Sequence, residues 1–317
     1  MQTRDTDRLW LPHSLLVGIG LAAATAVISG IAVYLNSQAV KELNDATLFT
    51  TLKNGVAAAL LTALLMAKPA ARRAIRSLTP RQWLGLAALG VVGGSLPFLL
   101  FFNGLAMASA PSAAFIHKTL FIWVALLATP LLNERLGWPQ LAALGMLLGS
   151  QLLIAHPTGV EWGGGETLIA AATGLWAVEV VVARRLLRSV PSTVGAAGRM
   201  TIGFVVLGGY AILSGRLGAI SGLTATEWLW IVGTGLLLTV YVAAWYAALR
   251  RAPATLVTSI LVAGAPITAI LSSLGAGAVP ASGVLAGFGL ALVGVVSLGW
   301  VAVHGSRPLG AATHRTT

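Results

Sequence analysis

The sequence contains no cysteine, and charged residues make up only 9% of its 317 residues. The absence of cysteine excludes disulfide bonds, thiol catalysis and thiolate metal sites. A soluble domain carries roughly 25% charged residues, so this chain has too little charge to cover a surface that faces water. We therefore expect most of its outer surface to face lipid.

Patterns typical of enzymes and metal proteins are also missing. The five histidines are scattered, without the spacing of metal ligands, and no glycine-rich phosphate-binding loop is present. No predicted helix contains an aspartate, and His117 has no obvious serine partner, so an intramembrane enzyme is a remote alternative. We expect no catalytic residues, no metal, no cofactor and no use of ATP.

Apolar residues dominate: 57% of the chain is hydrophobic and the mean hydropathy is +0.87. A helix needs about 20 apolar residues to cross a membrane. The run from Leu15 to Leu35 is too long for the core of a signal peptide, so we expect it to be retained as the first helix. Apolar runs and turn signals together predict ten membrane helices, at residues 14–36, 46–66, 82–106, 110–132, 139–156, 165–184, 193–214, 227–249, 253–274 and 282–303. Capping boxes at Thr79–Gln82 and Thr224–Glu227 mark the starts of the third and eighth.

Basic residues are unevenly distributed among the loops. If the N-terminus is cytoplasmic, only Lys41 and Arg216 lie in outside loops, while Lys53, Lys118 and Arg199 lie inside helices. Because basic residues of short loops stay on the cytoplasmic side, we predict an all-α integral membrane protein of ten helices with both termini cytoplasmic. The net charge of +11 then reflects topology, and we expect no nucleic-acid partner. The inside loops hold fifteen basic residues: Arg4, Arg8, Lys68, Arg72, Arg73, Arg76, Arg81, Arg135, Arg184, Arg185, Arg188, Arg250, Arg251, Arg307 and Arg315.

The two halves of the chain resemble each other. Trp83 is followed seven residues later by Gly90, and Trp228 is followed at the same distance by Gly235. Ala110-Pro111 and Ala252-Pro253 open the fourth and ninth helices, and Lys53 and Arg199 lie in the second and seventh. We therefore predict two five-helix repeats, residues 1–156 and 157–317. Because five is an odd number, the second repeat is inverted across the membrane, an arrangement typical of transporters with a binding site near the midplane.

These residues resemble the EamA family of the drug/metabolite transporter superfamily. The resemblance is carried by Lys53, Ala110-Pro111, Asn133-Glu134-Arg135 and Gly145, and it covers helices one to ten. The family usually has a glutamate in the fourth connection, matching Glu134, whereas the second repeat reads Gly275-Ala276-Gly277 instead. By general similarity the chain looks most like the YddG-type aromatic amino-acid exporters. The first helix lacks the glutamate with which small four-helix members exchange cations for protons.

Two charged residues within helices are candidate substrate contacts. Lys118, beside His117, would bind a substrate carboxylate, or else pair with Glu179 or a helix-end carbonyl, since an isolated intramembrane lysine costs about 2.5–3.5 kcal/mol. Glu179 would take part in proton coupling or bind an amino group, or else form an ion pair at the helix terminus near Arg184. Lys53 and Arg199 are expected to anchor the fold by extending to the nearer interface, and Glu134 to cap or pair within its loop.

Aromatic side chains cluster on the third, fourth, sixth and eighth helices. Such residues would form the walls of a cavity for an apolar amino acid; the alternative is an interfacial belt or lipid-facing packing. Pro97 and Pro266 interrupt helices and are candidate hinges. The predicted substrate contacts are Lys118, His117, Phe98, Phe101, Phe121, Trp176, Glu179, Tyr241, Trp245 and Tyr246.

The sequence therefore predicts a secondary transporter that exports amino acids, aromatic or large and neutral, across a bacterial-type inner membrane by alternating access. The alternative with the same fold carries drugs, other metabolites or lipids. We expect a small-molecule substrate and membrane lipids as partners, with a monomer as one possible state.

Overall fold

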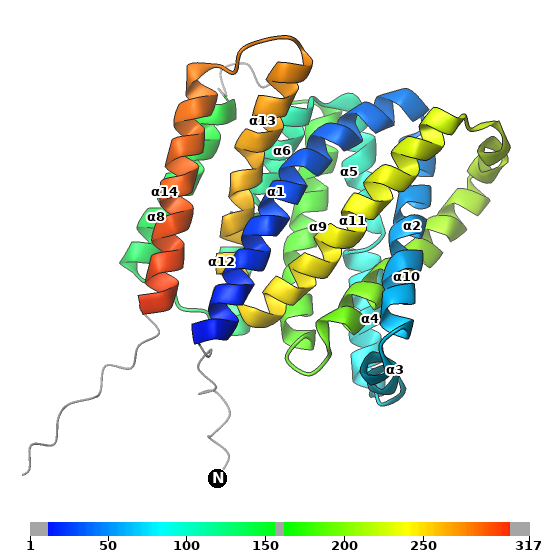
Figure 1. Ribbon diagram of the computed structural model, residues 1–317, viewed down its shortest axis with the longest axis horizontal. Helices are drawn as coiled ribbons and strands as arrows, with labels where there is room; N and C mark the ends of the chain where they lie inside the picture. The colour runs from blue at the N-terminus through cyan, green and yellow to red at the C-terminus, as the bar shows by residue number, and fades with distance from the viewer. Residues whose placement is uncertain (1–11, 156–161, 305–317) are drawn as a thin grey trace, which may run out of the picture.

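The computed structural model describes residues 12–155 and 162–304, and these residues form helices and turns without a β-strand. Within them, nine helical segments are long and apolar enough to cross a membrane, and Trp138–Ile154 forms a shorter apolar helix. Together they make a bundle in which successive spans run in alternate directions (Figure 1). The chain is therefore built as a multi-pass membrane protein.

The first half of the chain forms seven helices of the bundle and one short surface helix. Asp45 accepts hydrogen bonds from the backbone N–H groups of Thr47 and Leu48, which fixes the start of the second helix. The elements are α1 (Pro12–Leu43), α2 (Ala46–Met66), the short α3 (Pro69–Arg76), α4 (Pro80–Val92), α5 (Leu96–Met107), α6 (Ala110–Lys118), α7 (Leu120–Leu132) and α8 (Trp138–Ala155).

The second half repeats this order. Its elements are α9 (Gly164–Leu186), α10 (Ser192–Leu213), the 3₁₀ turn η2 (Arg216–Gly222), α11 (Ala225–Arg251), α12 (Ala254–Ile260), the 3₁₀ turn η3 (Leu261–Ala263), α13 (Gly264–Gly275) and α14 (Ser282–His304). The beginning of α1, the end of α14 and the short helix α3 lie at the same end of the bundle (Figure 1).

Each predicted helix range coincides with helical structure, and both predicted capping boxes are present, at Thr79 and at Thr224. The first range was too short, because α1 continues to Leu43 and places Lys41 in its last turn and not in a loop. The short helix α3 was not predicted. The predictions for Arg4, Arg8, Arg307 and Arg315, and for the repeat boundary at residues 156 and 157, fall outside the described residues.

The matched tryptophan–glycine pairs mark equivalent helix crossings in the two halves. At Gly90 of α4 the helix packs directly against Ile202 of α10, and at Gly235 of α11 it packs against Val56 of α2. A side chain at either glycine would collide with the facing isoleucine or valine, so both positions favour a residue without one. Each repeat therefore packs its third helix onto the second helix of the other repeat, as two inverted copies related by a two-fold axis would.

Three of the described apolar spans are broken near their middle, between α4 and α5, between α6 and α7, and between α12 and α13. Pro97 lies in the first turn of α5, after the break at Gly93–Ser95 that separates it from α4. Pro266 lies in the first turn of α13, after the 3₁₀ turn η3. Because proline has no N–H, it fits the first turn of a helix and leaves an earlier carbonyl without its helical donor. Both predicted hinge prolines thus begin the second segment of an interrupted helix.

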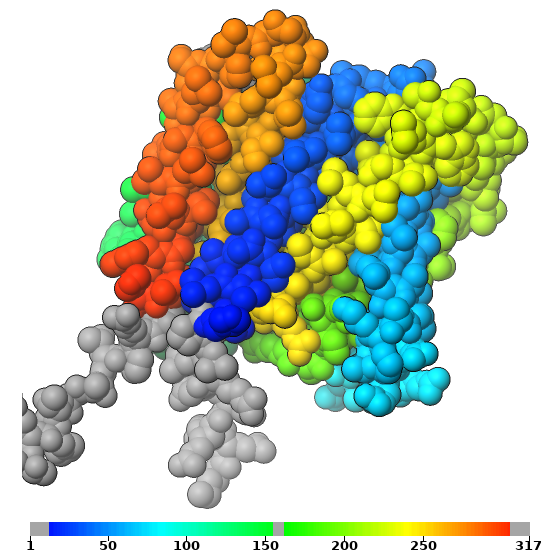
Figure 2. Space-filling model, viewed as in Figure 1, coloured from blue at the N-terminus to red at the C-terminus, as the bar shows by residue number. Residues whose placement is uncertain are grey.

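The outside of the bundle is apolar. Side chains of α14, α8 and α10 such as Val296, Leu152 and Val205 are exposed. In Figure 2 helices α14, α1 and α11 form a broad continuous face. Exposed apolar residues on this scale suit contact with lipid and not with water.

Candidate functional site: a cavity between the two repeats

A cavity of about 80 Å³ lies inside the bundle and is lined by both halves of the chain. Helices α1, α2, α5, α6 and α7 line it from the first half, and α9, α10 and α11 from the second. Its lining residues are Ser29, Ala32, Val33, Asn36, Lys53, Phe98, Phe101, Phe102, His117 and Leu120 in the first half, and Trp176, Glu179, Val180, Arg199, Thr234, Leu238, Tyr241 and Trp245 in the second.

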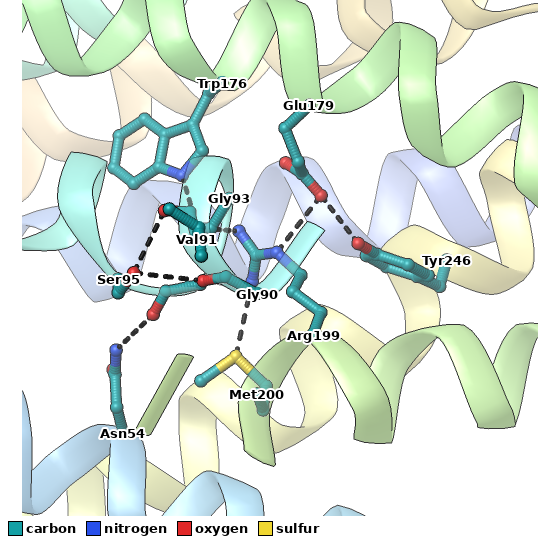
Figure 3. A network of polar contacts seen from close by, with 11 residues as sticks. Asn54, Gly90, Val91, Gly93, Ser95, Trp176, Glu179, Arg199, Met200 and Tyr246 are labelled. Carbon is teal, nitrogen blue, oxygen red and sulfur yellow. Dashed lines mark hydrogen bonds and ion pairs between the residues drawn. The ribbon is translucent and has the colours of Figure 1, made fainter. Parts of the chain in front are cut away.

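A buried ion pair forms one side of the cavity. Arg199 Nε lies 3.1 Å from Glu179 Oε1, and Tyr246 donates a hydrogen bond of 2.6 Å to the same oxygen. Figure 3 shows the Glu179 carboxylate between the guanidinium and the phenol. The Nε contact lacks hydrogen-bond geometry, so the attraction to Glu179 is mainly one of charge. Burial makes such a pair costly unless further hydrogen bonds support it.

The break between α4 and α5 supplies that support. Arg199 Nη2 donates to the carbonyl oxygen of Gly93 at 2.9 Å, and Trp176 Nε1 donates to the same oxygen at 3.1 Å (Figure 3). Asn54 Nδ2 donates to the neighbouring carbonyl of Gly94 at 3.3 Å. The interrupted backbone therefore orients two cavity-lining side chains, Arg199 and Trp176.

Aromatic rings form the remaining walls. The Trp176 ring lies 5.4 Å from those of Phe98 and Phe101 and 5.0 Å from the His117 ring, measured between centroids. From α11, Tyr241 and Trp245 stack with their centroids 6.1 Å apart. The Nδ1 atom of the buried His117 has no hydrogen-bond partner among the described residues. The cavity thus combines flat apolar surfaces with a polar atom available to a ligand.

Lys53 brings a second cation to the cavity. Lys53 is 1% exposed, and its ammonium group lies 3.3 Å from Asn36 Oδ1 and 3.7 Å from the centroid of the Phe102 ring. The expectation that Lys53 and Arg199 extend to the membrane interface was therefore wrong, since both side chains are buried and line the cavity. The rule that intramembrane charges avoid lipid could have identified them.

Lys118 lies outside the cavity lining. Its Nζ atom donates to Ser29 Oγ at 2.5 Å, and its side chain passes close to Gly264 at the start of α13. The predicted alternative, a pair with Glu179, is not formed, because Glu179 pairs with Arg199. Lys118 therefore joins α1, α6 and α13, while its neighbour His117 faces the cavity.

The other predicted substrate contacts also fall into two groups, those that line the cavity and those that do not. Phe98, Phe101, Trp176, Glu179, Tyr241 and Trp245 line the cavity. Phe121 is buried in the core beside it, and Tyr246 acts on it through Glu179. Sequence reasoning missed Asn36, Lys53, Arg199 and Thr234 as lining residues. No group of metal-binding side chains occurs in the described parts of the chain.

Glu134 links the two halves at the end of the bundle where α1 begins. Its carboxylate accepts hydrogen bonds from the backbone N–H groups of Ala254 and Thr255, at 2.7 and 3.0 Å, and from the Thr255 hydroxyl at 2.7 Å. The residue is structural, as expected, but its partner is the start of α12 and not its own loop.

A family model described as the EamA-like transporter family matches residues 16–155 and 163–300, which correspond to the two halves described above. The chain belongs to this family. Members of the EamA-like family are transporters and not enzymes, so the cavity is best considered as part of a transport path.

One solved structure, titled only "Crystal structure of protein", is similar to this EamA-like chain with a TM-score of 0.69 and 20% sequence identity. The match covers 93% of this chain and 99% of the other. At this identity the likeness concerns the fold alone. The comparison with curated proteins gave no match.

Proposed function

We propose that the chain is a secondary transporter that exports amino acids, aromatic or large and neutral, by alternating access. The observation that carries the proposal is the composition of the cavity, in which both charge signs and a set of aromatic rings come from two inverted halves. An amino acid has charges of both signs and a side chain that aromatic walls accommodate. The chain would thereby resemble the YddG-type exporters within its family.

The size of the cavity supports a mechanism in which the halves move. At about 80 Å³ it is smaller than the roughly 300–1,000 Å³ of pockets that hold drug-sized ligands. A large side chain enters only if the walls separate. The breaks that precede Pro97 and Pro266 offer places where α5 and α13 can tilt relative to the segments before them.

The proposed topology has ten crossings, with α8 as the shortest, and both termini in the cytoplasm of a bacterial-type cell. The repeats are residues 1–156 and 157–317, and one chain suffices for a working monomer because it lines the whole cavity. Three observations support this orientation. Helix α3, with its three arginines, lies at the end of the bundle where α1 begins, and Arg135 follows α7 at that end. At the other end, Lys41 and Arg216 are the only lysine and arginine within the described ranges. Basic loops stay on the cytoplasmic side.

Cargo of other classes fits the cavity less well. A cationic drug needs a carboxylate to bind, but Glu179, the only carboxylate in the lining, already pairs with Arg199. A phosphorylated metabolite needs several free cations, whereas one of the two present is neutralised by Glu179. Drugs and other metabolites remain the alternative if amino acids are not carried.

The test is exchange of labelled phenylalanine in proteoliposomes that contain the purified full-length protein. Vesicles are preloaded with unlabelled phenylalanine, leucine, lysine or glutamate, and uptake of label is followed over time. Faster uptake into vesicles loaded with phenylalanine or leucine than into empty vesicles is expected. Equal uptake into all vesicles, with folded protein present, would exclude amino-acid exchange and favour the alternative cargoes.

A further inference from the structure

We infer that Lys53, together with Asn36, forms the docking site for a carboxylate group of the cargo. The inference rests on the proposed function as a transporter, and it deepens that function by naming the chemical group that the cavity recognises. It also assigns this role to Lys53, a residue of α2, and not to Lys118, which is not a lining residue and donates its hydrogen bond to Ser29.

The first argument comes from the equivalence of the two halves. Lys53 is the eighth residue of α2 and Arg199 is the eighth residue of α10, so the two cations occupy the same place in their repeats. Glu179 precedes Arg199 by the same number of residues as Val33 precedes Lys53. Both Glu179 and Val33 line the cavity. The first repeat therefore has the cation of the pair but a valine where the second has the carboxylate.

The second argument comes from the surroundings of the Lys53 ammonium group. Among the described residues, the only hydrogen-bond partner of the ammonium group is Asn36 Oδ1, at 3.3 Å. Three phenylalanine rings complete its environment, with centroids at 3.7, 5.3 and 5.7 Å, and neither ion pair of the described residues includes Lys53. An ammonium group has three donors, so two of them have no polar acceptor from the protein.

Charge balance leads to the same conclusion. Glu179 and Arg199 neutralise each other, which leaves Lys53 as the uncompensated cation of a lining that contains no second carboxylate. A buried charge without a partner is costly, and an anion that enters the cavity would offset this cost. A carboxylate could accept from the free donors of Lys53 and from the Asn36 amide. Its apolar substituent would then extend toward the ring of Phe98 or Trp176.

The experiment uses the purified full-length protein and three ligands with the same phenyl group. Phenylalanine has both charges, 3-phenylpropionate has only the carboxylate, and 2-phenylethylamine has only the ammonium group. Binding is followed by tryptophan fluorescence, since Trp176 and Trp245 line the cavity, and by the shift in thermal denaturation. The wild-type protein is expected to bind phenylalanine and 3-phenylpropionate and to bind 2-phenylethylamine far more weakly.

Two lysine variants provide the matched comparison. Lys53→Met and Lys118→Met each remove the ammonium group of a lysine that is 1% exposed, but only Lys53 lines the cavity. Loss of a hydrogen bond to a charged group predicts about ten- to hundredfold weaker binding of 3-phenylpropionate to the Lys53→Met variant. The Lys118→Met variant is expected to bind as the wild type does. The Lys53→Arg variant keeps the positive charge and is expected to retain most of the affinity for 3-phenylpropionate. It replaces Lys53→Met as the probe if the methionine variant does not fold.

Several results would overturn the inference. The first is equal affinity of the Lys53→Met and wild-type proteins for 3-phenylpropionate, and the second is loss of binding in the Lys118→Met protein alone. The inference also fails if the wild-type protein prefers 2-phenylethylamine, or if it binds neither 3-phenylpropionate nor 2-phenylethylamine. Failure of the proposed function can be distinguished from failure of the docking site. If vesicles show no phenylalanine exchange but 3-phenylpropionate still binds in a way that depends on Lys53, the proposed function is wrong and the docking site stands. Phenylalanine exchange that is undiminished in the Lys53→Met protein would leave the function standing and remove the docking site.

Discussion

Pro97 has no N–H group with which to bond the carbonyl oxygen of Gly93, four residues before it in the chain. In a continuous helix that carbonyl would accept the hydrogen bond of residue 97. Here it accepts from Arg199 of α10 and Trp176 of α9 instead. A proline in α5 therefore sets the position of a cavity arginine contributed by the other half of the chain. This backbone oxygen is the point at which the broken span and the buried ion pair meet.

Gly93→Ala is expected to destabilise the protein and disturb the ion pair. A methyl group built on Gly93 would overlap Cγ of Glu179 and lie 2.7 Å from its carboxyl carbon. Overpacking of this kind costs about 1–3 kcal/mol, so the midpoint of thermal denaturation should fall. The control is Gly174→Ala in α9, where a new methyl group meets no atom within 4 Å. A Gly93→Ala protein as stable as the control would show that the two helices do not approach as described.

Glu179→Gln and Arg199→Gln are expected to be severely destabilising when made singly. Each leaves the other member of a buried pair without its counter-charge, at a cost of about 3–5 kcal/mol. The double variant should lose less stability than the two single losses added together, because no unpaired charge remains. Thermal denaturation of all four proteins in one detergent measures this coupling. Strict additivity would mean that the two side chains do not interact.

Glu134→Ala is expected to weaken the link between the loop after α7 and the start of α12. The substitution removes three hydrogen bonds to Ala254 and Thr255 and leaves buried donors unsatisfied, a loss of about 1–3 kcal/mol per group. The lower denaturation midpoint should be partly restored in Glu134→Gln, whose amide oxygen still accepts. Glu42→Ala, an exposed glutamate of α1, is the control. Equal midpoints for Glu134→Ala and this control would contradict the bonding.

The absence of cysteine makes the chain a natural background for a topology test. Single cysteines at Ser77 and Gly137 should react with a membrane-impermeant maleimide only after the cells are opened. Cysteines at Ser221 and Trp162 should react in intact cells, since all four positions are exposed in the structure. Labelling of positions 137 and 162 from the same side of the membrane would show that α8 does not cross.

The positions of the helices could be predicted from the sequence to within a few residues at most of their ends. Backbone N–H and C=O groups cannot remain unpaired in lipid, so an apolar run of sufficient length becomes a helix almost irrespective of its neighbours. Thr79 and Thr224 add local capping that depends only on residues three positions away. The extension of α1 to Leu43 was missed because polar residues such as Asn36 and Lys41 interrupt its apolar run. The amphipathic helix α3 was missed because it is not an apolar run.

The site was predicted less well, because the contacts that define it join residues distant in the sequence. Phe98, Trp176 and Tyr241 were recognised from their type and clustering. Lys118 was predicted as a substrate contact and Lys53 as an anchor at the interface, although each is a lone lysine within an apolar helix and nothing local distinguishes them. Which of them faces the cavity depends on the rotation of α2 and α6 against their neighbours, and that is decided by side-chain packing.

The sequence by itself thus determined a helical membrane protein of two related halves, because hydropathy and charge act locally and leave a pattern along the chain. Only the tertiary structure decided the pairing of Arg199 with Glu179, the attachment of Arg199 to Gly93 and the unpaired state of Lys53. These depend on which faces of α2, α9 and α10 turn toward one another, and close packing between helices far apart in the chain fixes those faces.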